Sequence, residues 1–308
     1  MKAFLASRGS LLVMTLWVMV ILGALAVAVG RQLSVEVRLA RYRRAMDQAE
    51  TLARSGVLLA MQRLQQDVQQ MDEPYDWLDD DWAAMAVEGL EEMGVTGRIA
   101  IAMEDAARRL DVNAASAAQL GAVMGSPAAA QEVVDYRDAD TDGPSESPVE
   151  TAPYYYPKNG PVAAIEELRE LPGMSQDLFA ALQALTAAVP GSDPNPIVNI
   201  NTASREVLQA VGLTGLADAI VLFREQGHYF TSLSPDVLTD DPSVPPPFDP
   251  ADTEFQNARA TLGVVSHVFT VQVTAVMESP AVRRSLTALI RRYPGGTELP
   301  RIVAWREG

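Results

Sequence analysis

A stretch of twenty-one residues without a charge, Ser10 to Gly30, constrains this chain more than any other feature. At about 1.5 Å per residue it makes a helix of roughly 32 Å, long enough to cross the hydrocarbon core of a bilayer. The short leader before it carries Lys2 and Arg8, and basic residues favour the cytoplasmic side. We therefore expect one membrane span with the N-terminus in the cytoplasm. Five arginines beyond the span oppose this orientation: Arg31, Arg38, Arg41, Arg43 and Arg44.

The segment could instead be a secretory signal peptide that is removed. Three small residues, Ala24, Ala26 and Ala28, offer a cleavage site of that kind. Beyond the span, however, apolar residues recur every three or four positions as far as Gln70, and no proline occurs before Pro74. This spacing predicts that the apolar helix continues into an amphipathic one, which a signal peptide has no reason to do.

Composition excludes several kinds of chemistry. With 40 acidic and 24 basic residues the net charge is −16, which repels a phosphate backbone, so we expect no nucleic-acid partner. The chain has no cysteine, and thiol nucleophiles, cysteine-ligated metals and disulfides are therefore excluded. Its two histidines, His228 and His267, lack metal-binding spacings. We expect a protein that is not an enzyme, because no base is placed beside a nucleophile.

Four segments alternate apolar and polar residues in the manner of β-strands: 97–103, 267–277, 283–293 and 301–305. We expect an antiparallel sheet whose apolar face is covered by the amphipathic part of the N-terminal helix. For each segment alone, a short buried helix is the alternative. The residues between the first two segments are helical and loop-rich, so they form an α-helical insertion in the sheet domain.

The insertion contains a weak internal repeat. Two pairs of segments match, at offsets of 88 and 87 residues: Asp111–Leu120 with Asn199–Leu208, and Val133–Arg137 with Ile220–Arg224. Ser116 and Ser204 are expected N-caps of the helices that follow. The second copy is similar to helix-hairpin-helix or SAM-like modules. Gly212 and Gly215 in its turn leave open a backbone contact to phosphate, which the acidic charge of the chain opposes.

An acidic loop at residues 135–143 has the beginning of an EF-hand pattern. Alternating carboxylates can converge on one hard cation, and Gly143 permits the tight turn that this requires. The pattern then stops, because its twelfth position holds Val149 in place of glutamate. A solvated acidic turn is the alternative to calcium binding. The expected ligands are Asp138, Asp140 and Asp142, with Asp135, Glu146 and Glu150 as weaker candidates.

The N-terminal residues carry a family resemblance. A basic leader ending in Gly9, a cut before Ser10, an apolar stretch and an amphipathic continuation resemble the class III signal of type IV pilins and type II secretion pseudopilins. Most of that family has glutamate at the fifth residue after the cut, where this chain has Met14. With the large size of the chain, this departure resembles the K-type minor pseudopilins.

The resemblance implies an α+β fold. A long N-terminal transmembrane and amphipathic helix packs on an antiparallel pseudopilin sheet, with a large α-helical insertion of the SAM-like or helix-hairpin-helix kind. The expected divisions are a leader (1–9), a transmembrane helix (10–30), the amphipathic helix with the first part of the sheet (31–108), the insertion (109–260) and the remaining strands (261–308). The family resemblance also implies three further features of this chain. A prepilin peptidase would cut between Gly9 and Ser10, the new amine on Ser10 would be methylated, and calcium would bind in the acidic loop.

The implied function is structural: a minor pseudopilin at the tip of a periplasmic pseudopilus, needed for protein export across the outer membrane. The chain would be a single-pass inner-membrane protein whose bulk is periplasmic. Its expected partners are the I-, J- and H-type minor pseudopilins, the major pseudopilin, the prepilin peptidase, secreted substrates and the outer-membrane secretin. The alternatives are a membrane-anchored helix-hairpin-helix binding protein of the DNA-uptake type and a secreted hydrolase with a cleaved signal.

Overall fold

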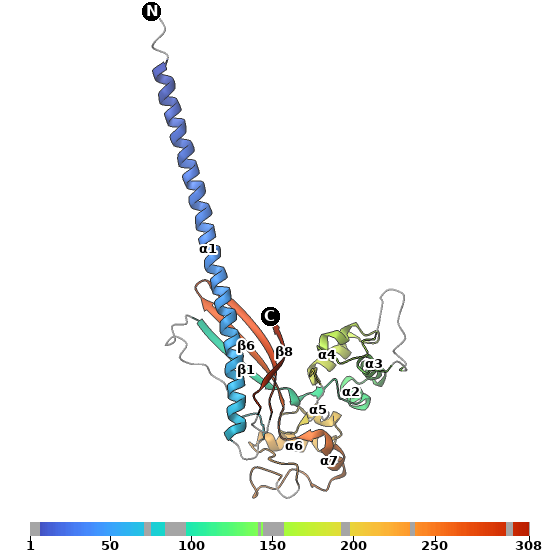
Figure 1. Cartoon of the computed structure of the whole chain (residues 1–308). Helices are drawn as coiled ribbons and strands as arrows, with labels where there is room; N and C mark the ends of the chain where they lie inside the picture. Colours follow the sequence, from blue (N-terminus) through green and yellow to red (C-terminus); the bar gives the residue numbers. More distant parts are fainter. Residues whose placement is uncertain are drawn as a thin grey trace, which may run out of the picture.

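One long helix begins the computed structural model, which describes residues 7–70, 75–83, 97–140, 143, 157–191, 198–234, 238–293 and 298–307. This helix, α1 (Ser7–Gln70), has 64 residues, and its N-terminal half stands away from the rest of the molecule (Figure 1). Every residue from Leu11 to Arg44 is exposed, whereas buried residues recur from Ala45 onward. The predicted continuous helix, apolar and then amphipathic, is confirmed.

The C-terminal half of α1 lies on a four-stranded sheet of order β1-β6-β7-β8, in which all neighbours are antiparallel. Its strands are β1 (Gly97–Asp105), β6 (Val268–Glu278), β7 (Ala281–Arg291) and β8 (Arg301–Glu307). Helix and sheet approach closely, since a Cβ on Gly56 would lie 2.6 Å from Cγ1 of Val273 on β6. Leu52, Val57 and Leu64 of α1 share one apolar core with the sheet. The four predicted strands and their helical cover are confirmed.

Between β1 and β6 the chain forms a helical insertion made of two repeats (Figure 1). After η1 (Ala106–Arg108), the first repeat comprises β2 (Leu110–Asp111), α2 (Ala117–Met124), α3 (Pro127–Arg137), η2 (Ile165–Glu170), α4 (Gln176–Leu185) and β3 (Thr186–Ala187). The second comprises β4 (Val198–Asn199), α5 (Arg205–Ala210), α6 (Ala217–Glu225), α7 (Thr253–Ala258), η3 (Arg259–Thr261) and β5 (Leu262–Gly263). Both predicted N-caps, Ser116 and Ser204, are confirmed. Each repeat closes on itself, because its first and last strands pair in parallel.

Equivalent asparagines hold the two repeats in the same way. Oδ1 of Asn113 accepts a hydrogen bond from the backbone N of Val162 at 2.7 Å, and Nδ2 donates to its carbonyl at 2.9 Å. Asn201, 88 residues further on, makes the same two bonds with the backbone of Phe230, both at 2.8 Å. Each side chain thus pairs with a distant backbone segment as a β-strand would.

Equivalent arginines brace the repeats as well. Arg137, at the end of α3, donates to the carbonyl of Val112, and Arg224 on α6 donates to the carbonyl of Ile200 at 2.8 Å. The acceptors are also 88 residues apart. The sequence repeat is therefore a structural repeat as well.

The second repeat is joined to the sheet by buried polar residues that we call the docking network: Asp76, Asp105, Asn199, Thr202 and Ser266. Nδ2 of Asn199 lies 3.1 Å from the carbonyl of Asp76, 3.3 Å from Oδ2 of Asp105 and 2.7 Å from Oγ of Ser266. The hydroxyl of Thr202 donates to the same Asp105 oxygen at 2.5 Å. Asp105 ends β1, and burial raises its pKa to about 6. The sheet and the second repeat consequently share a common polar core.

Candidate assembly helix and acidic turn

The N-terminal part of α1 is a large apolar surface without a cover. A helix over Leu11–Gln69 is long and apolar enough to cross a membrane. Its most apolar window has a mean hydropathy of 2.7, and none of that window is buried. Trp17 is 62% exposed and Leu12 70%. Side chains of this kind need a bilayer or apolar partners around them.

Position 14 brings no carboxylate to this surface. Met14 is 68% exposed, and the adjacent hydroxyl of Thr15 is used within the helix, where it donates to the carbonyl of Leu12 at 2.9 Å. Gly9 and Ser10 belong to α1 by their backbone, but their side chains lie outside the described part of the structure. Cleavage and methylation there stay predictions.

The acidic turn, residues 135–143, follows from the way α3 ends. Asp138 is the C-cap of this helix, and its N–H donates to the carbonyl of Val134 at 3.0 Å. One turn earlier, Asp135 is 1% exposed and accepts a hydrogen bond from Nε2 of Gln131 at 2.6 Å. The chain then returns to this carboxylate, because a Cβ on Gly143 would lie 2.6 Å from Cγ of Asp135. Only glycine therefore fits where the turn closes.

Asn159 braces the acidic turn from a distant segment. Its Nδ2 donates to the carbonyl of Asp140, and its backbone N donates to that of Tyr136, both at 3.0 Å. Its Oδ1 is buried and accepts no hydrogen bond from any described residue, and an amide oxygen is a common calcium ligand. No sequence pattern singles this asparagine out. Of the predicted ligands, Asp135, Asp138 and Asp140 lie in the described turn, and Asp142, Glu146 and Glu150 lie outside the described residues.

The turn between α5 and α6 contains Gly212 and Gly215, for which the sequence leaves open a backbone contact to phosphate. Gly212 has φ of +102°, a conformation that favours glycine on steric grounds alone. The backbone N of Gly215 already donates to Oε2 of Glu254 at 2.8 Å. A carboxylate therefore occupies the position that a phosphate would need, and the turn serves helix packing.

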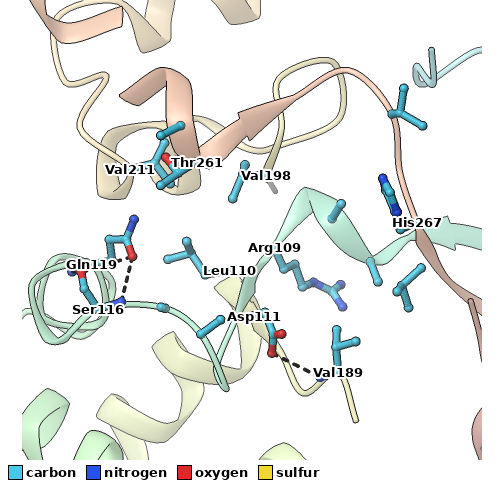
Figure 2. Close-up of a pocket in the computed structure, with 17 residues that line it drawn as sticks. Arg109, Leu110, Asp111, Ser116, Gln119, Val189, Val198, Val211, Thr261 and His267 are labelled. Atoms are coloured by element: carbon cyan, nitrogen blue, oxygen red, sulfur yellow. Dashed lines mark hydrogen bonds between the residues drawn. The ribbon is translucent and has the colours of Figure 1, made fainter. Parts of the chain in front are cut away.

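A cavity of about 420 Å³ lies between the two repeats and the start of β6 (Figure 2). Leu110 comes from the first repeat, Val198 and Val211 from the second, and His267 from the segment that leads into β6. The hydroxyl of Ser116 on its wall is engaged in the capping box of α2. The cavity therefore lies at a seam between packed elements.

A single apolar helix that continues onto an antiparallel sheet defines the class of protein. The exposed half is long and apolar enough to cross a membrane, and the buried half is part of the globular core. This is the architecture that the resemblance of the N-terminal residues predicts.

Comparison with known proteins narrows the class. Residues 100–191 match the family described as type II secretion system (T2SS), protein K. The fold is similar to that of a chain in the crystal structure of the GspK-GspI-GspJ complex from the enterotoxigenic Escherichia coli type 2 secretion system. The TM-score is 0.66 and the identity 20%, covering 87% of this chain and 99% of that chain. No curated protein matches the chain. The family match covers the end of β1 and the first repeat, and the structural likeness extends the similarity in fold to most of the chain.

Proposed function

We propose that this subunit caps the tip of a periplasmic pseudopilus. Before assembly, residues 10–30 hold it in the inner membrane with its N-terminus in the cytoplasm and its bulk in the periplasm. The exposed apolar half of α1 is the observation that carries this proposal. In a filament, those side chains are removed from water by packing against the same segment of neighbouring subunits.

Met14 supports a position at the tip. Most pseudopilins have a glutamate here, which neutralises the N-terminal amine of a neighbouring subunit inside an apolar filament, where an unpaired charge is costly. A subunit with Met14 does not supply that carboxylate, so it ends the stack. The helical insertion beside the sheet adds bulk that obstructs a further subunit above it (Figure 1).

The proposed partners are the I-, J- and H-type minor pseudopilins and the major pseudopilin. The structural relative comes from a GspK-GspI-GspJ complex, which supports the first two. A prepilin peptidase would cut between Gly9 and Ser10, with methylation of the new amine. Secreted substrates and the outer-membrane secretin are the further partners that a tip position makes accessible.

Calcium in the acidic turn is part of the proposal. Three features support the fit: alternating carboxylates at Asp138 and Asp140, the enforced turn at Gly143, and the buried Oδ1 of Asn159. Oxygen ligands of these types suit a hard divalent cation. When bound, the cation would draw together carboxylates that otherwise repel one another.

Single-cysteine labelling tests the tip position, because the chain contains no cysteine of its own. Leu222 on α6 is 55% exposed, so Leu222→Cys offers an attachment point for gold. Imaging of assembled pseudopili should show gold at one end only. Gold along the filament length would contradict the proposal, and adding Met14→Glu should increase such lateral labelling.

The mature N-terminus tests the processing step. Mass spectrometry should find a chain that begins at a methylated Ser10, and Gly9→Val should leave the precursor uncut. A mature terminus near Ala28 would instead identify an ordinary signal peptide.

A further inference from the structure

Three buried aspartates gather where α1 meets the globular domain. Asp67 lies in the last turns of α1, and Asp76 and Asp80 lie in the segment that follows. They are 6%, 0% and 5% exposed, respectively, and one carboxylate oxygen from each lies within 4.8 Å of the others. We call these three residues the basal carboxylates.

Within the described part of the chain, one buried cation faces the basal carboxylates. Arg292, just after β7, is 1% exposed. Its Nη1 lies 2.6 Å from Oδ2 of Asp67, and its Nη2 is bonded to Oδ2 of Asp76. Nη2 also donates to the carbonyl of Ser266 at 2.9 Å, and the guanidinium lies over the ring of Phe269. The arginine therefore offsets one of up to three negative charges, and the charge of Arg63 also acts on Asp67.

Two oxygens of the cluster have no partner in the described part of the chain. Oδ1 of Asp76 and Oδ2 of Asp80 are both buried, and neither accepts a hydrogen bond there. Oδ1 of Asp80 is bonded to the backbone N of Asp81 at 2.7 Å, so only the second oxygen remains available. Buried carboxylate oxygens without a donor or a counter-charge are costly. Such atoms point to a ligand that brings positive charge.

We propose that the basal carboxylates bind one hard divalent cation of the calcium or magnesium class. Its charge offsets that of the carboxylates that Arg292 does not neutralise, and the cluster offers only oxygen ligands, which these cations prefer. Bound there, the cation ties the end of α1 to residues 75–83, the segment that carries Asp76 and Asp80. This site is separate from the acidic turn in the insertion and does not depend on the proposed tip position.

The protonation behaviour of the cluster is consistent with such a site. Burial raises the pKa of Asp80 to about 7, and the nearby charges of Asp67 and Asp76 also raise it. Burial likewise raises the pKa of Asp67 and of Asp76, against the effect of Arg292. Protons therefore compete with the cation for these oxygens, so protonation and cation binding have to be distinguished experimentally.

Terbium luminescence gives a direct test, because Tb³⁺ replaces Ca²⁺ and is excited through nearby tryptophan. Trp82 is 2% exposed and two residues from Asp80. The full chain in detergent would carry Asp138→Asn and Asp140→Asn, to remove the acidic turn as a binding site. We expect tryptophan-excited Tb³⁺ emission that saturates and is displaced by Ca²⁺. Trp82→Phe should lower the emission without changing the affinity.

Two aspartate variants decide the outcome. Asp80→Asn should weaken Tb³⁺ binding at least tenfold, whereas Asp79→Asn, at an exposed neighbour, should leave it unchanged. Circular dichroism should show both variants folded. Equal emission from Asp80→Asn and the parent chain would overturn the proposal. So would a melting temperature that follows pH near neutrality but is the same in calcium, magnesium and chelator, because protons alone would then neutralise the cluster.

Discussion

The two repeats of the insertion share a scaffold but have different surroundings. Each begins with a short strand, is braced by an asparagine and closes with a parallel strand. The residue that ends the first strand is Asp111 in one repeat and Asn199 in the other. Asp111 is partly exposed, whereas Asn199 is fully buried beside the carboxylate of Asp105. The surroundings therefore determine which of two similar side chains each repeat carries.

Exchanging these two residues tests the comparison most strongly. Asn199→Asp places a second carboxylate beside Asp105 in the docking network, and we expect a loss of about 3–5 kcal/mol in the free energy of unfolding at neutral pH. Asp111→Asn is the matched control. Its Oδ1 still accepts the bonds from the backbone N of Asn113 and Val189, so the expected loss is about 1 kcal/mol. Denaturant unfolding of the full chain measures both, and equal losses would remove the distinction between the repeats.

Of the two repeats, calcium should act on the first alone. In an Asp80→Asn background, which removes the basal site, saturating calcium at a hundredfold excess over Kd should stabilise the chain by about 2.7 kcal/mol. Replacing Asp138, Asp140 and Asp142 together by asparagine should abolish the shift and hold or raise the calcium-free melting temperature, because carboxylate repulsion is removed. Thermal melts in calcium and in chelator check this. A shift that survives the triple change would place the ion elsewhere.

Asn113 and Asn201 should contribute unequally to the free energy of unfolding, because they are buried to different extents. Asn201 is 1% exposed, and Asn201→Ala leaves the N–H and carbonyl of buried Phe230 without partners. We expect a loss of about 2–3 kcal/mol. Asn113 is only partly buried, so water can replace its bonds to Val162 and Asn113→Ala should cost about 1 kcal/mol. Urea unfolding curves of the two variants, measured side by side, give the two losses in free energy of unfolding. A larger loss for Asn113→Ala than for Asn201→Ala would contradict the prediction.

The smallest expected effect concerns pH. Burial raises the pKa of Asp105 from 3.8 to about 6, so the folded state holds this proton more tightly than the unfolded state. The stability that results is fully present below about pH 4 and is lost as the pH rises through 6. Thr202→Val removes a donor to the charged form, so it should raise the pKa of Asp105 further.

This variant should therefore cost about 1 kcal/mol at pH 7.5 and less at pH 4. Unfolding at both pH values measures the difference. Thr274→Val, at a partly exposed threonine on β6, is the control and should show no such pH dependence. The position equivalent to Thr202 in the first repeat is Ala114, which has no hydroxyl to lose.

Sequence periodicity accounts for much of the fold. The helix to Gln70 and the four long strands were predictable because burial on one face imposes a period of three to four, or of two, on the residues themselves. Ser116 and Ser204 were predictable because capping is local. The strands that close each repeat have two residues each, too few for any period to be visible.

The polar sites were less accessible to sequence reasoning, since their partners are distant. The acidic turn was recognisable from its spacing, but the brace at Asn159 comes from a separate segment. Arg292 lies 225 positions from Asp67. The docking network likewise joins Asp105 to Asn199, 94 positions apart. Only the folded chain brings such groups together.

The uninterrupted course of α1 also fixes a distance. Between the end of the apolar span and the first buried residue, Ala45, lie the fourteen exposed positions 31–44, which as a helix measure about 21 Å. Without a proline to bend it, this stalk acts as a stiff spacer. In the proposed membrane orientation, the stalk would hold the globular body clear of the membrane surface by about the width of two helices, and an axial displacement of the apolar span would reach the sheet through one continuous helix.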